Sequence, residues 1–131
     1  MKQKLGYLFS TLTAIYFLIS GLSVLLDVSG KLERIDLSAL NSDGEIAFIL
    51  IYTSLMVGIG VASLTLQLFS KSWVYSSLLV TIIIGSFIVF RIVGSIMVGF
   101  LSSAQTNFLA IEIVEFVAGI LLLRTEKFKK P

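Results

Sequence analysis

The chain has 131 residues, of which 56% are hydrophobic and only 14% are charged, whereas a soluble domain usually carries about a quarter charged residues. It has no cysteine and no histidine, which excludes thiol–disulfide chemistry, thiolate metal sites, haem ligation by histidine and histidine proton relays. The net charge of +2 says little, because the positions of the charges matter more than their sum.

Four long runs of the sequence carry no charge, and they lie at 5–26, 46–70, 72–90 and 92–111. An apolar run of about 18 residues or more is long enough to cross the hydrocarbon core as a helix. We therefore predict an all-α integral membrane protein, with residues 1–131 forming one transmembrane domain. Its four helices form an up-down-up-down bundle, with bounds of about 5–26, 45–69, 73–101 and 103–124.

The first predicted helix, 5–26, follows a short basic start. A secretory signal peptide also begins with lysines and an apolar stretch. The length of the run and the lack of an Ala-x-Ala-like site favour a retained helix.

An acidic outer loop is predicted at 27–44, the only sizeable loop. Leu32, Ile35 and Leu40 suggest the apolar side of a short surface helix within it. Ser42 and Glu45 have the spacing of a capping box at the start of the second helix.

The third predicted helix, 73–101, follows a tight turn at Lys71 and would be about 43 Å long, more than the bilayer core requires. We expect a tilt, a protruding end, or a bend near Gly94 or Gly99. A second capping box, Ser102 with Gln105, opens the fourth helix.

Basic residues predict the orientation of the bundle. Lys31 and Arg34 are the only two in the outer loop, and seven lie in the other short segments: Lys2, Lys4, Lys71, Arg124, Lys127, Lys129 and Lys130. Because positive charge accumulates on the cytoplasmic side, both termini are predicted to be cytoplasmic.

Small residues are expected to let the helices approach, since lipid is as apolar as leucine and hydrophobicity alone does not pack them. Ser54, Gly58 and Ala62 form a stripe with a period of four, and Gly60 is nearby. Gly94, Ser95 and Gly99 are the corresponding residues of the third helix. Packing within the bundle and a homodimer surface are both open interpretations.

Three ionisable residues interrupt the predicted spans: Arg91, Glu112 and Glu115. Each costs about 3 kcal/mol or more at the bilayer centre, so unpaired burial is disfavoured. Glu112 and Glu115 share one helix face because they are three residues apart. Counting from the turn between the last two helices puts Arg91 level with residue 114, between the two glutamates. Counting from the cytoplasmic edge favours Glu112, so we expect an Arg91–Glu112 pair with Glu115 adjacent.

Hydroxyl groups fall at a similar depth in the outer half of the predicted bundle: Tyr16, Ser20, Tyr52, Thr53, Ser54 and Ser95. They are candidates for an outward-facing polar pocket, or they bond to their own helix backbones. With one arginine and two glutamates, one carboxyl is expected to resist ionisation. A ligand or proton site, an ion pair that fixes helix register and a contact with a partner protein all remain open.

The sequence resembles the DoxX-like superfamily of small four-helix bacterial membrane proteins, and within it a family of unknown function. The resemblance rests on Gly58-x-Gly60, on Arg91 followed by Gly94, and on a glutamate at Glu112 or Glu115. It implies cytoplasmic termini and a multi-pass location in the bacterial cytoplasmic (inner) membrane. The family's arginine near a Tyr-Gly-Gly is missing, since 50–54 reads Leu-Ile-Tyr-Thr-Ser. Related proteins range from quinone-linked subunits to lipid-binding and chaperone-like proteins.

We therefore predict a membrane binding or accessory protein that holds a lipid-like or quinone-like molecule, or a protein partner. A proton-coupled transporter of small cations that uses Glu112 and Glu115 is the alternative. Small multidrug transporters match in length and helix number, but they place their key glutamate in the first helix, which here has none. An enzyme is disfavoured, because no motif links the serines, tyrosines and carboxylates. The sequence indicates no metal site, no nucleic-acid partner and no particular cofactor.

Overall fold

The computed structural model describes residues 2–124, and within them the chain forms helices, turns and loops but no strand. In order, the elements are α1 (Lys2–Leu22), the short 3₁₀ turn η1 (Ser23–Leu25), α2 (Val28–Arg34), α3 (Ser42–Phe48), the π-helical segment η2 (Ile49–Thr53), α4 (Ser54–Ser70), α5 (Trp73–Val98) and α6 (Ser103–Arg124).

Four helical stretches of the described chain are long and apolar enough to cross a membrane: Lys2–Leu25, Ser42–Ser70, Trp73–Val98 and Ser103–Arg124. The predictions of an all-α chain and of four candidate spans are thus confirmed. The third stretch ends at Val98 and not at residue 101, because Gly99 takes the left-handed conformation (φ 73°) that closes a helix.

The helix caps differ from those predicted. Asn41, not Ser42, caps α3, since its Oδ1 accepts from the Gly44 amide at 2.9 Å and Ser42 already lies inside the helix. At the start of α6, the Ser102 hydroxyl accepts from the Gln105 amide at 3.2 Å, as in half of a capping box. The other half is not formed, because the Gln105 side chain is bonded elsewhere.

The outer loop contains one short helix, α2, which starts earlier than expected. Asp27 caps it by accepting from the Gly30 amide at 2.9 Å. Leu32 is buried, but Leu40 is 98% exposed and contributes nothing to an apolar side.

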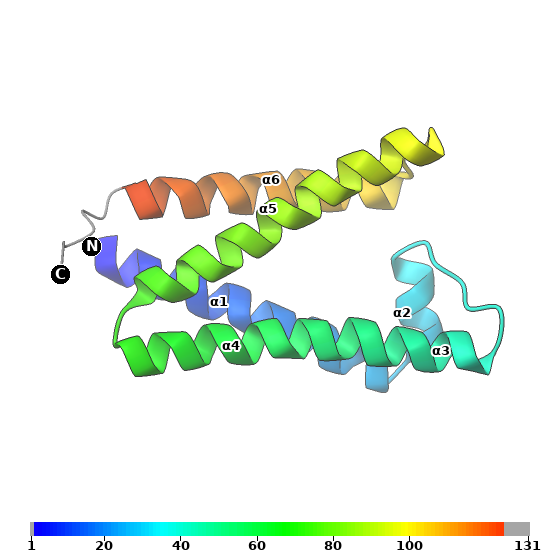
Figure 1. Cartoon of the computed structure of the whole chain (residues 1–131), viewed down its shortest axis with the longest axis horizontal. Coiled ribbons are helices and arrows are strands. Elements are labelled where there is room, and N and C mark those ends of the chain that lie inside the picture. The colour runs from blue at the N-terminus through cyan, green and yellow to red at the C-terminus, as the bar shows by residue number, and fades with distance from the viewer. Residues whose placement is uncertain (1, 125–131) are drawn as a thin grey trace.

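The four long stretches run alternately up and down and pack as two pairs, α1 with α4 and α5 with α6 (Figure 1). The pairs are closest at the end that holds the α4–α5 turn (Figure 1). At the same end, the Tyr7 hydroxyl of α1 donates to the Lys71 carbonyl at the end of α4 at 2.8 Å. The pairs separate toward the end that holds α2 and α3 (Figure 1).

The core lies where α5 crosses the α1–α4 pair. Phe17, Ile59, Val80 and Ile84 are buried together there. Toward the closed end, the Trp73 ring fills the space that Gly6 leaves open by lacking a side chain. Small residues at such crossings let the backbones approach closely.

The expected small-residue stripe does not pack within the described bundle. Ser54, Gly58 and Ala62 are all exposed, and a Cβ on Gly58 would meet nothing within 4 Å. Gly60 lies on the other side of α4, where a Cβ would come within 2.6 Å of the Leu18 side chain. The stripe therefore faces away from α1, and its role as a homodimer surface stays a prediction.

The prediction that Gly94 of α5 and Gly99 at its end let a neighbouring helix approach is also wrong. A Cβ on Gly94 or Gly99 would meet nothing within 4 Å, so neither lets a neighbouring helix approach. Gly85 does so, because a Cβ there would come within 2.8 Å of the Phe116 ring. Gly119 of α6 likewise packs directly on Thr81.

Candidate functional site

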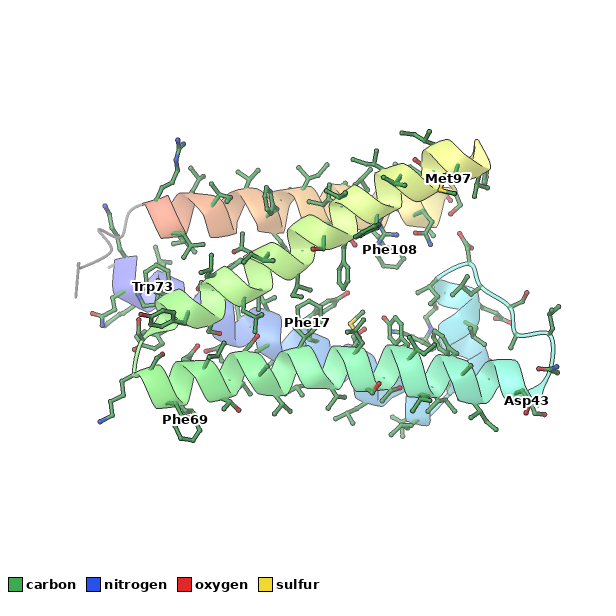
Figure 2. The ribbon with its side chains drawn as sticks, in the orientation of Figure 1. Phe17, Asp43, Phe69, Trp73, Met97 and Phe108 are labelled. Carbon is green, nitrogen blue, oxygen red and sulfur yellow. The ribbon has the colours of Figure 1, made fainter. Side chains whose placement is uncertain are left out.

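A cavity of about 490 Å³ lies between the two helix pairs. Its apolar wall includes Phe17, Met56, Ile84, Phe87, Phe108 and Ile111. Six polar or charged side chains also line it: Tyr16, Tyr52, Arg91, Gln105, Glu112 and Glu115. Phe17 of α1 and Phe108 of α6 project into the space between the pairs (Figure 2). Its size and mixed lining are typical of small-molecule sites, which span about 300–1,000 Å³.

Arg91 of α5 forms a two-point ion pair with Glu112 of α6. Its Nε donates to Oε2 of Glu112 at 3.0 Å, and its Nη2 donates to Oε1. The planar guanidinium matches both carboxylate oxygens at once, which fixes orientation as well as distance. The two side chains are only 20% and 12% exposed, so water competes weakly for either partner.

The rest of the Arg91 guanidinium is also occupied. Its Nη1 donates to Oε1 of Gln105, and its carbon lies 5.5 Å from the centre of the Phe108 ring. Gln105 in turn donates from Nε2 to the Ile35 carbonyl at 3.0 Å. Arg91 is therefore a structural connection between α5, α6 and the outer loop.

Glu115 differs from Glu112 although both carboxylates line the cavity. Within residues 2–124, no hydrogen bond or ion pair to the Glu115 carboxylate is found. One guanidinium and two carboxylates thus line the cavity, a formal charge of −1 if all three are ionised. Glu115 is the charged group left open to a ligand.

Tyr52 and its neighbours form a second polar group beside the cavity. The Tyr52 hydroxyl lies 3.0 Å from Oγ of Ser20, which also accepts from Nζ of Lys31 at 3.1 Å. The Lys31 ammonium sits 5.4 Å from the centre of the Tyr52 ring. Tyr52 belongs to the π-helical segment η2, and such segments are frequent at functional sites.

The outer loop covers part of the cavity. Ile35 and Leu37 line it, and Asp36 between them accepts a hydrogen bond from the Ser102 hydroxyl. Asp36 has a φ of 57°, the left-handed conformation, which an aspartate tolerates better than most residues. With the Gln105–Ile35 bond, this contact attaches the loop to the start of α6 at two points.

Five candidate residues from the sequence meet in this cavity: Arg91, Glu112, Glu115, Tyr16 and Tyr52. The other candidates for the pocket do not line it: Ser20, Thr53, Ser54 and Ser95. The Ser54 hydroxyl donates to the Leu50 carbonyl, and the Ser95 hydroxyl donates to the Ile92 carbonyl at 2.8 Å. Both follow the alternative in which a hydroxyl bonds to its own helix.

Gln105, Phe108 and Lys31 are contacts that the sequence reasoning missed. A signal existed for two of them, because Gln105 and Phe108 precede Glu112 by seven and four residues and share its helix face. The capping-box spacing accounts for Gln105 without a contact to Arg91. Nothing in the sequence pairs Lys31 with Tyr52.

Among residues 2–124, no group of three or more Asp, Glu, His or Cys side chains is arranged to hold a metal ion. No protein-family model matches the chain, and no curated protein or solved structure matches it either. The resemblance to the DoxX-like superfamily therefore stays a prediction.

Proposed function

We propose that this protein spans a membrane four times and binds a small amphiphilic molecule, lipid-like or quinone-like, in the cavity between its two helix pairs. The observation that carries the proposal is the cavity itself. It combines an aromatic and aliphatic wall with a few polar groups that converge from several helices, as small-molecule sites do.

The outer surface of the helices supports a membrane location. Large apolar side chains are exposed along the long helices, among them Leu68 (75%), Phe69 (86%) and Met97 (81%). A soluble monomer rarely exposes apolar patches of this extent, whereas hydrocarbon chains solvate them well.

For the orientation, we propose cytoplasmic termini in a bacterial cytoplasmic membrane. Lys2, Lys4, Lys71 and Arg124 belong to one end of the bundle, opposite Lys31 and Arg34. The other basic residues used for the prediction, Lys127, Lys129 and Lys130, lie outside the described residues. The positive-inside rule supports this orientation, and it agrees with the expected DoxX-like membership.

The bonding of the cavity residues indicates how a ligand lies. Arg91 is fully engaged by Glu112 and Gln105, so it acts as a brace. The polar end of a ligand therefore meets Glu115 and the tyrosines. Its apolar part lies along Phe17 and Phe87 of the opposite wall.

Native mass spectrometry of protein released gently from its membrane tests this proposal. We expect a bound small molecule on the natural chain. Met56→Trp fills part of the cavity and should remove it, because Met56 lines the wall. Leu55→Trp is the matched control, since Leu55 is 50% exposed and does not line the cavity. Equal occupancy in both variants, or no bound molecule in the natural chain, contradicts the proposal.

A further inference from the structure

The three ionisable side chains that line the cavity, Arg91, Glu112 and Glu115, sum to a formal charge of −1 when all are ionised. Glu112 is neutralised by Arg91 through two bonds, and the remaining face of Arg91 is taken by Gln105 and Phe108. Glu115 lies one turn further along α6 and keeps an open carboxylate. When this carboxylate is ionised, its counter-ion must come from outside residues 2–124.

Both basic side chains of the outer loop, and its Asp36, are bonded elsewhere. Lys31 of α2 donates to Ser20 and does not line the cavity. Asp36 of the loop accepts from Ser102, and Arg34 pairs with Asp27 at 3.5 Å. Within the described residues, no cation is therefore bonded to Glu115.

The wall of the cavity, like Glu115, favours a positively charged ligand. Aromatic rings from all four long stretches line it, namely Tyr16, Phe17, Tyr52, Phe87 and Phe108. The face of an aromatic ring is electronegative and attracts ammonium groups, most strongly where water is excluded. An anionic head group in this cavity would instead be repelled by Glu115.

We infer that the ligand is an organic cation, a protonated or quaternary amine that carries an apolar chain. Its charged head lies against the Glu115 carboxylate and the tyrosine rings, and its chain follows the apolar wall. The inference rests on the proposed function, since it specifies the head group of the molecule held in the same cavity.

Three probes with one common chain test the head group: decyltrimethylammonium, decanol and decyl sulfate, each radiolabelled. Binding is measured to the full chain in nanodiscs of zwitterionic lipid, with empty nanodiscs subtracted. We expect the cation to bind about tenfold more tightly than decanol, and decyl sulfate to bind most weakly. This comparison needs only the natural protein, so it does not depend on how a variant folds.

Glu115→Gln then assigns the effect to one residue. It should weaken cation binding about tenfold and leave decanol binding within about a factor of two. Glu45→Gln, which removes a carboxylate from the first turn of α3, is the matched control and should change neither.

The outcomes separate the inference from the proposed function. If decanol binds as tightly as the cation and Met56→Trp blocks both, the inference is overturned and the binding cavity stands. The inference is also overturned if Glu115→Gln leaves cation binding unchanged. If no probe binds, or if Met56→Trp blocks the binding of none of the probes, the inference and the proposed function fail together.

Discussion

Arg91 of α5 and Glu112 of α6 are joined by two parallel hydrogen bonds, while Glu115, three residues beyond Glu112, has none within the described chain. The pair fixes how the last two helices lie against each other. It also separates two chemically identical side chains into a structural carboxylate and one open to a ligand. This difference underlies the proposed ligand class.

Removing one partner of the ion pair should destabilise the bundle. Arg91→Leu leaves Glu112 mostly buried without its cation, and we expect a loss of about 3 kcal/mol in the free energy of unfolding. Titration with a denaturing detergent, followed by circular dichroism, measures it. The double variant Arg91→Leu/Glu112→Leu should recover most of the loss. Equal losses in the single and double variants would contradict the buried-pair explanation.

Two glycines of α4, two residues apart, should respond differently to the same substitution. A Cβ on Gly60 would lie 2.6 Å from the Leu18 side chain and 2.9 Å from the Ala14 carbonyl oxygen, so Gly60→Ala should cost about 1–3 kcal/mol of stability. Gly58→Ala meets no neighbour within 4 Å and should stabilise by up to about 1 kcal/mol through helix propensity. The same detergent titration compares them, and equal effects would show that α4 is rotated differently.

The attachment of the outer loop to α6 should depend on Ser102. Ser102→Ala removes the donor to Asp36 and the cap of the Gln105 amide, a loss of about 1 kcal/mol. Hydrogen exchange at the Ile35, Asp36 and Leu37 amides, which all bond within the loop, should then become about fivefold faster. Ser103→Ala, at an exposed neighbouring position, is the control. Unchanged exchange would mean that the loop is held by other contacts.

The proposed orientation can be tested with single cysteines, because the chain has none of its own. A membrane-impermeant thiol reagent should label Leu40→Cys, which is 98% exposed in the outer loop, in intact cells with a permeable outer envelope. Lys71→Cys in the α4–α5 turn should be labelled only after the membrane is broken. The reverse labelling pattern would show that the bundle has the opposite orientation in the membrane.

The sequence by itself determined the number of long helices and, to within a few residues, where they lie. Uncharged apolar runs of this length are typical of membrane-spanning helices. Polar residues or glycines lie near the ends of these helices, where the backbone must turn. It also determined that Arg91 needs a partner on α6, since an unpaired arginine is too costly among apolar helices.

Only the tertiary structure decided which side of each helix faces its neighbours. Helices that are apolar all round give no stripe to mark their packed side, so Ser54, Gly58 and Ala62 could not be recognised as outward-facing from their spacing. The Arg91–Glu112 pair was expected from the sequence, but the rotation of α5 and α6 made it a two-point contact and brought Gln105 to Arg91. The path of the outer loop placed Ile35 and Leu37 over the cavity. Such contacts join residues far apart in the chain, and they depend on rotations and tilts that a pattern of hydrophobicity does not encode.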